Sequence, residues 1–122
     1  MEKSLRITRL EEQFKRDLGV LVLEKARDPR IKDVTVLGVE VSKDLEYAKV
    51  YVSIIGDDEA KKQAMAVLKA ASGYFRTELA GLHDIRKVPE LRFILDNSIE
   101  HGMRIDKLLS ELGYPRKDEQ NN

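Results

Sequence analysis

The apolar side chains in the first quarter of the chain recur every three or four residues. The stripe that they form consists of Ile7, Leu10, Phe14, Leu18 and Leu21. This spacing predicts one amphipathic helix over residues 4–26, with Ser4 as its N-cap. Asp28-Pro29 ends the helix, because the residue before a proline is kept out of the helical conformation.

β-branched residues then dominate two short segments. Residues 33–42 and 47–55 are predicted strands, and the short polar link between them favours an antiparallel hairpin. The alternation of the first strand changes phase at Gly38, which predicts a bulge or a bend there. In the second strand Ala48, Val50, Val52 and Ile54 share one face, and Tyr47, Lys49, Tyr51 and Ser53 share the other.

Helical periodicity returns over residues 57–81, with one interruption. Ser and Gly disfavour the interior of a helix, so Ala71, Ser72 and Gly73 predict a kink between two helices. Gly81 is expected to end the second helix, because glycine adopts the left-handed conformation common at helix ends.

The rest of the pattern adds a third strand over residues 88–96 and a last helix over residues 98–112. This order predicts an α+β fold in which a three-stranded mixed sheet carries the helices on one face. The long helical connection before the third strand predicts a parallel pair. We expect one domain over residues 1–113 and a flexible polar tail over residues 114–122.

Composition narrows the class of protein. The chain has 122 residues, of which 42% are hydrophobic and 36% charged, and no apolar run approaches the ~20 residues of a membrane span. It contains no cysteine and no apolar signal core near its N-terminus, so a cytoplasmic protein is expected. With two histidines and no phosphate-binding or serine-nucleophile motif, no catalytic residue, cofactor or metal site is predicted. A small hydrolase built on His83, which we expect in a loop, is the weakest alternative.

Charge is balanced overall but unevenly distributed. Basic and acidic side chains number 22 each. Residues 1–32 carry a net charge of +3 and residues 61–92 a net charge of +4, whereas the other two segments are acidic. If the two basic segments adjoin in space, the protein has one basic side.

The basic residues of these segments are the candidate RNA-binding residues. The set consists of Arg6, Arg9, Arg16, Arg27, Arg30, Lys69, Arg76, Arg86, Lys87 and Arg92. The first three share helical spacing and form a stripe that could contact phosphates. The Ala71-Ser72-Gly73 kink is a further candidate, because its small residues let a phosphate approach the backbone. A kink without a ligand is the commoner outcome of such a sequence, and both interpretations stay open.

Several short motifs together resemble the ribosome-binding factor A family, which has a type II K-homology (KH-like) fold. The motifs are Asp28-Pro29-Arg30, Val41-Ser42-Lys43-Asp44-Leu45 with Ala48-Lys49-Val50-Tyr51-Val52-Ser53, Ala71-Ser72-Gly73 with Arg76, Arg86, Pro89-Glu90-Leu91 with Phe93, and Asp96 with Ser98. The family replaces the Gly-x-x-Gly loop of K-homology domains with an Ala-x-Gly kink, which Ala71-Ser72-Gly73 matches.

The resemblance implies a protein that binds the small (30S) ribosomal subunit and contacts its 16S rRNA near the 5′ region and the decoding region. It implies a role in late 16S rRNA processing that matters most in the cold, release aided by a GTPase assembly factor, and no enzymatic activity. We expect a monomer that does not bind membranes. The alternative is a protein-interaction module that acts through the open face or the edge of the sheet.

Overall fold

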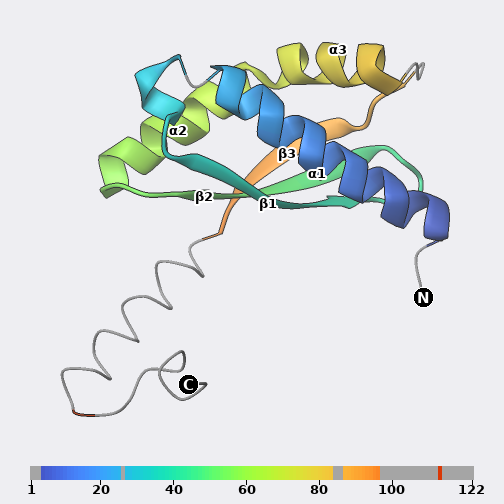
Figure 1. Cartoon of the computed structure of the whole chain (residues 1–122), viewed down its shortest axis with the longest axis horizontal. Helices are drawn as coiled ribbons and strands as arrows, with labels where there is room; N and C mark the ends of the chain where they lie inside the picture. Colours follow the sequence, from blue (N-terminus) through green and yellow to red (C-terminus); the bar gives the residue numbers. More distant parts are fainter. Residues whose placement is uncertain (1–3, 26, 84–86, 97–112, 114–122) are drawn as a thin grey trace.

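The computed structural model describes residues 4–25, 27–83, 87–96 and 113. Its elements are α1 (Leu5–Lys25), the 3₁₀ helix η1 (Pro29–Ile31), β1 (Val34–Val41), β2 (Tyr47–Ile54), α2 (Asp58–Ala70), α3 (Ser72–His83) and β3 (Glu90–Leu95). The three α-helices lie on one face of the sheet (Figure 1). The predicted α+β fold and its order of elements are therefore confirmed. The predicted last helix over residues 98–112 and the tail lie outside the described residues.

The three strands form one mixed sheet with the order β1-β2-β3. β1 and β2 are antiparallel, and β2 and β3 are parallel, as the helical crossover predicted. The register between β1 and β2 passes from Val36–Val52 to Gly38–Tyr51, so Leu37 has no partner on β2. The bulge predicted at Gly38 is confirmed.

Capping residues fix where the helices begin. The hydroxyl of Ser4 accepts a hydrogen bond from the amide of Ile7 at 3.2 Å at the start of α1. Asp57 caps α2 by accepting from the amide of Ala60 at 2.8 Å. Gly56 precedes this cap with a φ of 152°, and a Cβ there would lie 3.0 Å from the Cβ of Ala60, so the turn into α2 requires glycine.

The predicted break between the second and third helices is also confirmed. α2 ends at Ala70 and α3 begins at Ser72, with Ala71 between them at φ −90° and ψ 1°. This conformation is outside the regular helix, so the two helices change direction at a single residue.

The prediction that Gly81 ends α3 and leaves His83 in a loop is wrong. α3 continues to His83. Gly81 does not take the left-handed conformation that would close a helix. The last turn is held against α1, because Nε2 of His83 lies 2.5 Å from Oδ2 of Asp17 and the imidazole packs edge-on against Phe14.

The core fills the space between the helices and one face of the sheet. Its fully buried side chains include Phe14, Leu18, Val50, Val52, Phe75 and Leu79. On the opposite face, Tyr47 and Lys49 of β2 are exposed. No helix among the described residues is long and apolar enough to cross a membrane.

Candidate nucleic-acid interface

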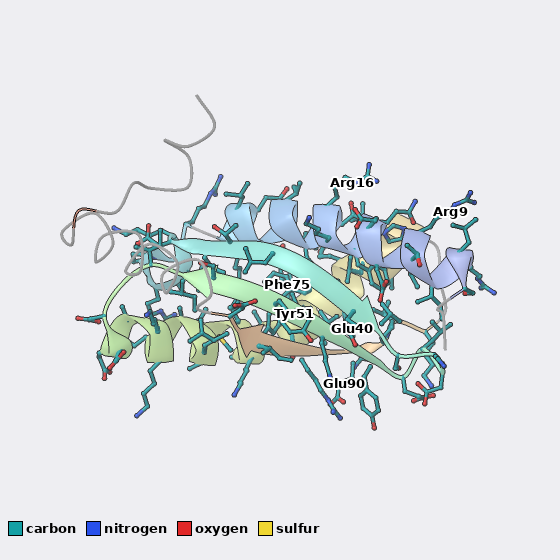
Figure 2. All side chains as sticks on the ribbon, turned by 90° about the horizontal axis from the view of Figure 1, so that it is seen from below. Arg9, Arg16, Glu40, Tyr51, Phe75 and Glu90 are labelled. Atoms are coloured by element: carbon teal, nitrogen blue, oxygen red, sulfur yellow. The ribbon has the colours of Figure 1, made fainter. Side chains whose placement is uncertain are left out.

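Arg6, Arg9 and Arg16 lie on the solvent side of α1. All three side chains are exposed, and Figure 2 shows Arg9 and Arg16 extending outward from this helix. Among the described residues, none of the three has an ion pair or a hydrogen bond from its side chain. A guanidinium without an internal partner is available to pair with a phosphate, often through two hydrogen bonds at once.

α1 and α3 lie side by side in the helical layer (Figure 1). Contacts at both ends of α3 join them: His83 pairs with Asp17 and packs against Phe14, and the ammonium of Lys25 lies 4.8 Å from the centre of the Tyr74 ring. The helical parts of the basic segments 1–32 and 61–92 therefore share one layer of the fold, whereas Arg92 lies on β3 in the sheet.

A groove follows the N-terminal half of α1. Arg6, Arg9, Lys43 and Lys87 all line it. Lys87 pairs with Glu46 at 2.7 Å, so its charge is partly satisfied within the chain. Sequence reasoning missed Lys43, because only the fold of the hairpin turn brings this residue beside α1.

The kink is closely packed on one side and open on the other. Ala71 is 8% exposed, and its amide donates to the carbonyl of Val67 at 2.9 Å. The hydroxyl of Ser72 donates to the carbonyl of Lys69 at 2.9 Å. Gly73 is exposed, and a Cβ built there would touch nothing within 4 Å. The fold itself does not need glycine at this position, and the space beside it is open.

A second groove adjoins the kink. Lys25, Asp28, Arg30, Ala70 and Ala71 are among the residues that line it. Sequence reasoning missed Lys25 as a candidate. Its spacing does not match the arginine stripe, and only the packing of α1 against α3 places it near the kink.

Arg30 has a strong partner beside it in the sequence. Its Nε donates to Oδ1 of Asp28 at 2.9 Å, and its Nη2 donates to Oδ2 at 2.5 Å. These hydrogen bonds lower the pKa of Asp28 from 3.8 to about 2 and raise the pKa of Arg30. Arg30 is therefore a weaker candidate for phosphate contact than the stripe on α1.

Two other predicted RNA-binding residues also have partners within the chain. Nη2 of Arg76 donates to the carbonyl of Val88 at 2.9 Å, which ties α3 to the segment before β3. Arg92 pairs with Glu90 at 3.2 Å on the open face of the sheet.

Three predicted residues remain. Arg27 and Lys69 are exposed, and the described structure gives neither side chain an ion pair or a hydrogen bond. Arg86 lies outside the described residues. All ten basic residues stay predictions as RNA contacts, but the unpaired group (Arg6, Arg9, Arg16, Arg27 and Lys69) carries the most available charge. Within residues 4–25, 27–83 and 87–96, no group of three or more His, Asp or Glu side chains could hold a metal ion.

Comparison with known proteins identifies one family. The family model described as "Ribosome-binding factor A" matches residues 6–109. A curated ribosome-binding factor A from Caldanaerobacter subterraneus subsp. tengcongensis is 45% identical over 112 residues, which cover 91% of this chain and 92% of the relative.

Solved structures agree with this match. The crystal structure of ribosome-binding factor A from Thermus thermophilus superposes with a TM-score of 0.65 at 31% identity and covers 73% of this chain and 93% of its own. The solution structure of a Thermotoga maritima protein also gives a TM-score of 0.65, at 38% identity, with 77% and 90% coverage. A homology model of the Thermus thermophilus protein was fitted into a cryo-electron microscopy map of a 30S complex. It superposes with a TM-score of 0.63 at 31% identity and covers 73% of this chain and 93% of its own.

Proposed function

This chain belongs to the ribosome-binding factor A family, and we propose that it binds the small (30S) ribosomal subunit and promotes late maturation of 16S rRNA. Proteins of this family are assembly factors and not enzymes. The observation that carries the proposal for this chain is the exposed and internally unpaired stripe of Arg6, Arg9 and Arg16. A related protein was fitted into a map of its complex with the 30S subunit, which supports the same partner here.

The arginine stripe and the kink contact different phosphates of the rRNA. Arg9 and Arg16 are seven residues apart, or about 10 Å along the helix axis, so they reach phosphates that are not adjacent in one strand. The kink lies near the other end of α1, where Gly73 leaves room for a backbone phosphate beside the unpaired Lys69. Binding is therefore dominated by charge and by the shape of folded rRNA, with little readout of base sequence.

The biological setting follows from the family resemblance. The contacts lie near the 5′ region and the decoding region of 16S rRNA, and a GTPase assembly factor aids release. The protein acts as a monomer in the cytoplasm and supports growth in the cold.

Co-sedimentation in a sucrose gradient with 30S and with 50S subunits tests this proposal. The wild-type chain is expected to sediment with 30S subunits only. Arg9→Glu with Arg16→Glu should weaken this binding sharply, while the matched control Lys49→Glu with Lys62→Glu should not. The control makes the same charge change at two exposed lysines, one on β2 and one on α2. Binding to both subunits, or equal losses from both double variants, would refute the proposal.

A second candidate function rests on the open face of the sheet. There Arg92 lies 3.8 Å over the Tyr47 ring and pairs with Glu90, and the Tyr51 hydroxyl donates to Glu40 at 3.4 Å. Figure 2 shows Glu40, Tyr51 and Glu90 on this side of the sheet. Mixed charge with exposed aromatic rings suits a protein partner better than RNA. Loss of 30S binding by the Lys49→Glu and Lys62→Glu control alone would favour this function.

A further inference from the structure

Tyr74 presents a large aromatic ring beside the kink. The residue is 40% exposed and follows Gly73 directly in the first turn of α3. It lies three residues after Ala71, the residue at which α2 and α3 meet. The fold buries the next residue, Phe75, completely and leaves the Tyr74 ring at the surface.

The surroundings of this ring are basic. Lys25 lies over the ring and also lines the groove next to the kink, which Arg30 lines as well. Asp28 lines the same groove and is paired with Arg30, so these two charges offset each other and Lys25 supplies the remaining positive charge of the groove. Lys69, in the last turn of α2, is exposed and has no charge partner in the described structure.

The groove can accommodate a flat group. Ala66, Ala70 and Ala71 line it with methyl groups only, so no bulky side chain projects from these positions. Gln63 lines it too, and its amide offers both a donor and an acceptor for the edge of a base.

We propose that Tyr74 is a stacking platform for one unpaired purine nucleotide of the bound RNA, with its phosphates neutralised by Lys25 and Lys69. The inference rests on the proposed function, because it assumes that this side of the protein faces rRNA. An aromatic ring stacks on any base, and a purine offers the larger surface. Lys25 leaves the ring when the base arrives, because a cation over an exposed tyrosine is held weakly, and its charge then meets a phosphate.

Tyr47 provides a matched control on the same chain. It is 41% exposed, and Arg92 lies 3.8 Å from the centre of its ring. However, Arg92 is paired with Glu90. Lys87, which precedes Arg92 on the same segment, is paired with Glu46. The two tyrosines thus have nearly equal exposure and a similar cation, but the cation over Tyr74 has no ion pair in the described structure, whereas Arg92 is paired with Glu90.

The chain contains no tryptophan, which allows a direct optical test. Tyr74→Trp and Tyr47→Trp each introduce a single tryptophan. Its emission is quenched when a base stacks on it. We would titrate each full-length variant with short single-stranded oligo(A) and oligo(U) RNAs of equal length at low salt. The expected result is quenching of the Tyr74→Trp variant, at lower concentrations of oligo(A) than of oligo(U), and none in the Tyr47→Trp variant.

Measurements of RNA binding by fluorescence anisotropy complete the test. Tyr74→Leu should weaken oligo(A) binding about tenfold and remove the preference over oligo(U), while Tyr47→Leu should change neither. Equal quenching at both positions, no quenching at Tyr74→Trp, or no measurable oligo(A) binding by the wild type would overturn the inference. If the wild type still sediments with 30S subunits in those cases, the stacking inference alone fails. If it does not, the proposed function fails as well.

Discussion

The carboxylate of Glu11 on α1 accepts a hydrogen bond from the backbone amide of Val41 in β1, with 2.7 Å between Oε2 and N. The next amide, that of Ser42, donates to the carbonyl of Tyr47 at 2.9 Å, so the Val41 amide points to the outer edge of the sheet. Glu11 therefore satisfies a donor that β2 does not reach and fixes the rotation of α1 on the sheet. Arg9, two residues earlier, consequently faces solvent on the opposite side of the helix.

Glu11→Ala should destabilise the protein by about 1–3 kcal/mol, because it leaves the amide of fully buried Val41 without its acceptor. Glu11→Gln keeps an acceptor and should lower the free energy of unfolding by less than half as much. Urea unfolding measures both. Glu12→Ala, at the exposed neighbouring position, is the control and should be nearly neutral. If Glu11→Ala lowers stability no more than Glu12→Ala does, the contact between Glu11 and Val41 does not hold the helix.

Gly73→Ala should raise stability by about 0.5–1 kcal/mol and still weaken 30S binding. The added Cβ meets nothing within 4 Å, and alanine favours the helix more than glycine does. The same methyl group occupies the space through which a phosphate would approach. Thermal melting and co-sedimentation measure the two effects separately. A more stable variant that binds as well as the wild type would leave the kink as a purely structural feature.

Asp28→Asn should lower stability at pH 7, and the difference from the wild type should vanish in acid. Arg30 lowers the pKa of Asp28 to about 2 in the folded state, below its ordinary value of 3.8. The ionised carboxylate therefore stabilises the fold above about pH 4, and this contribution is lost as the pH falls towards 2. Melting temperatures of both proteins at neutral pH, near pH ~4 and near pH ~2.5 provide the measurement. A difference that stays constant over this range would contradict the assignment.

The fold was predictable where its causes are local. The phase change at Gly38 and the weak helix formers Ser72 and Gly73 are visible in the sequence, and the structure has a bulge and a helix break there. Gly81 was misjudged because a tertiary contact, that of His83 with Asp17 across 66 residues, extends the helix past it. Local propensity does not include such contacts.

The candidate site was predictable in part for the same reason. The arginine stripe follows from the period of one helix, so the exposure of Arg6, Arg9 and Arg16 could be expected from their spacing. The partners of Arg76 and Arg92 depend on the path of the backbone and on neighbouring side chains, and spacing does not specify them. Lys25 and Lys43 were missed because tertiary packing alone brings them to the two grooves. Tyr74 adjoins the kink in the sequence, but only the packing of α3 shows that its ring stays exposed beside Lys25.

The salt dependence of 30S affinity tests the central claim most directly, because each neutralised phosphate releases counterions. Five of the ten predicted RNA-binding side chains have no ion pair or hydrogen bond within the described structure, namely Arg6, Arg9, Arg16, Arg27 and Lys69. The logarithm of the association constant should therefore fall against the logarithm of salt concentration with a slope of about −3 to −5. Arg9→Glu with Arg16→Glu should flatten this slope by about 2, and Lys49→Glu with Lys62→Glu should leave it unchanged. An affinity that does not respond to salt, or a slope that the arginine reversals leave intact, would contradict the account.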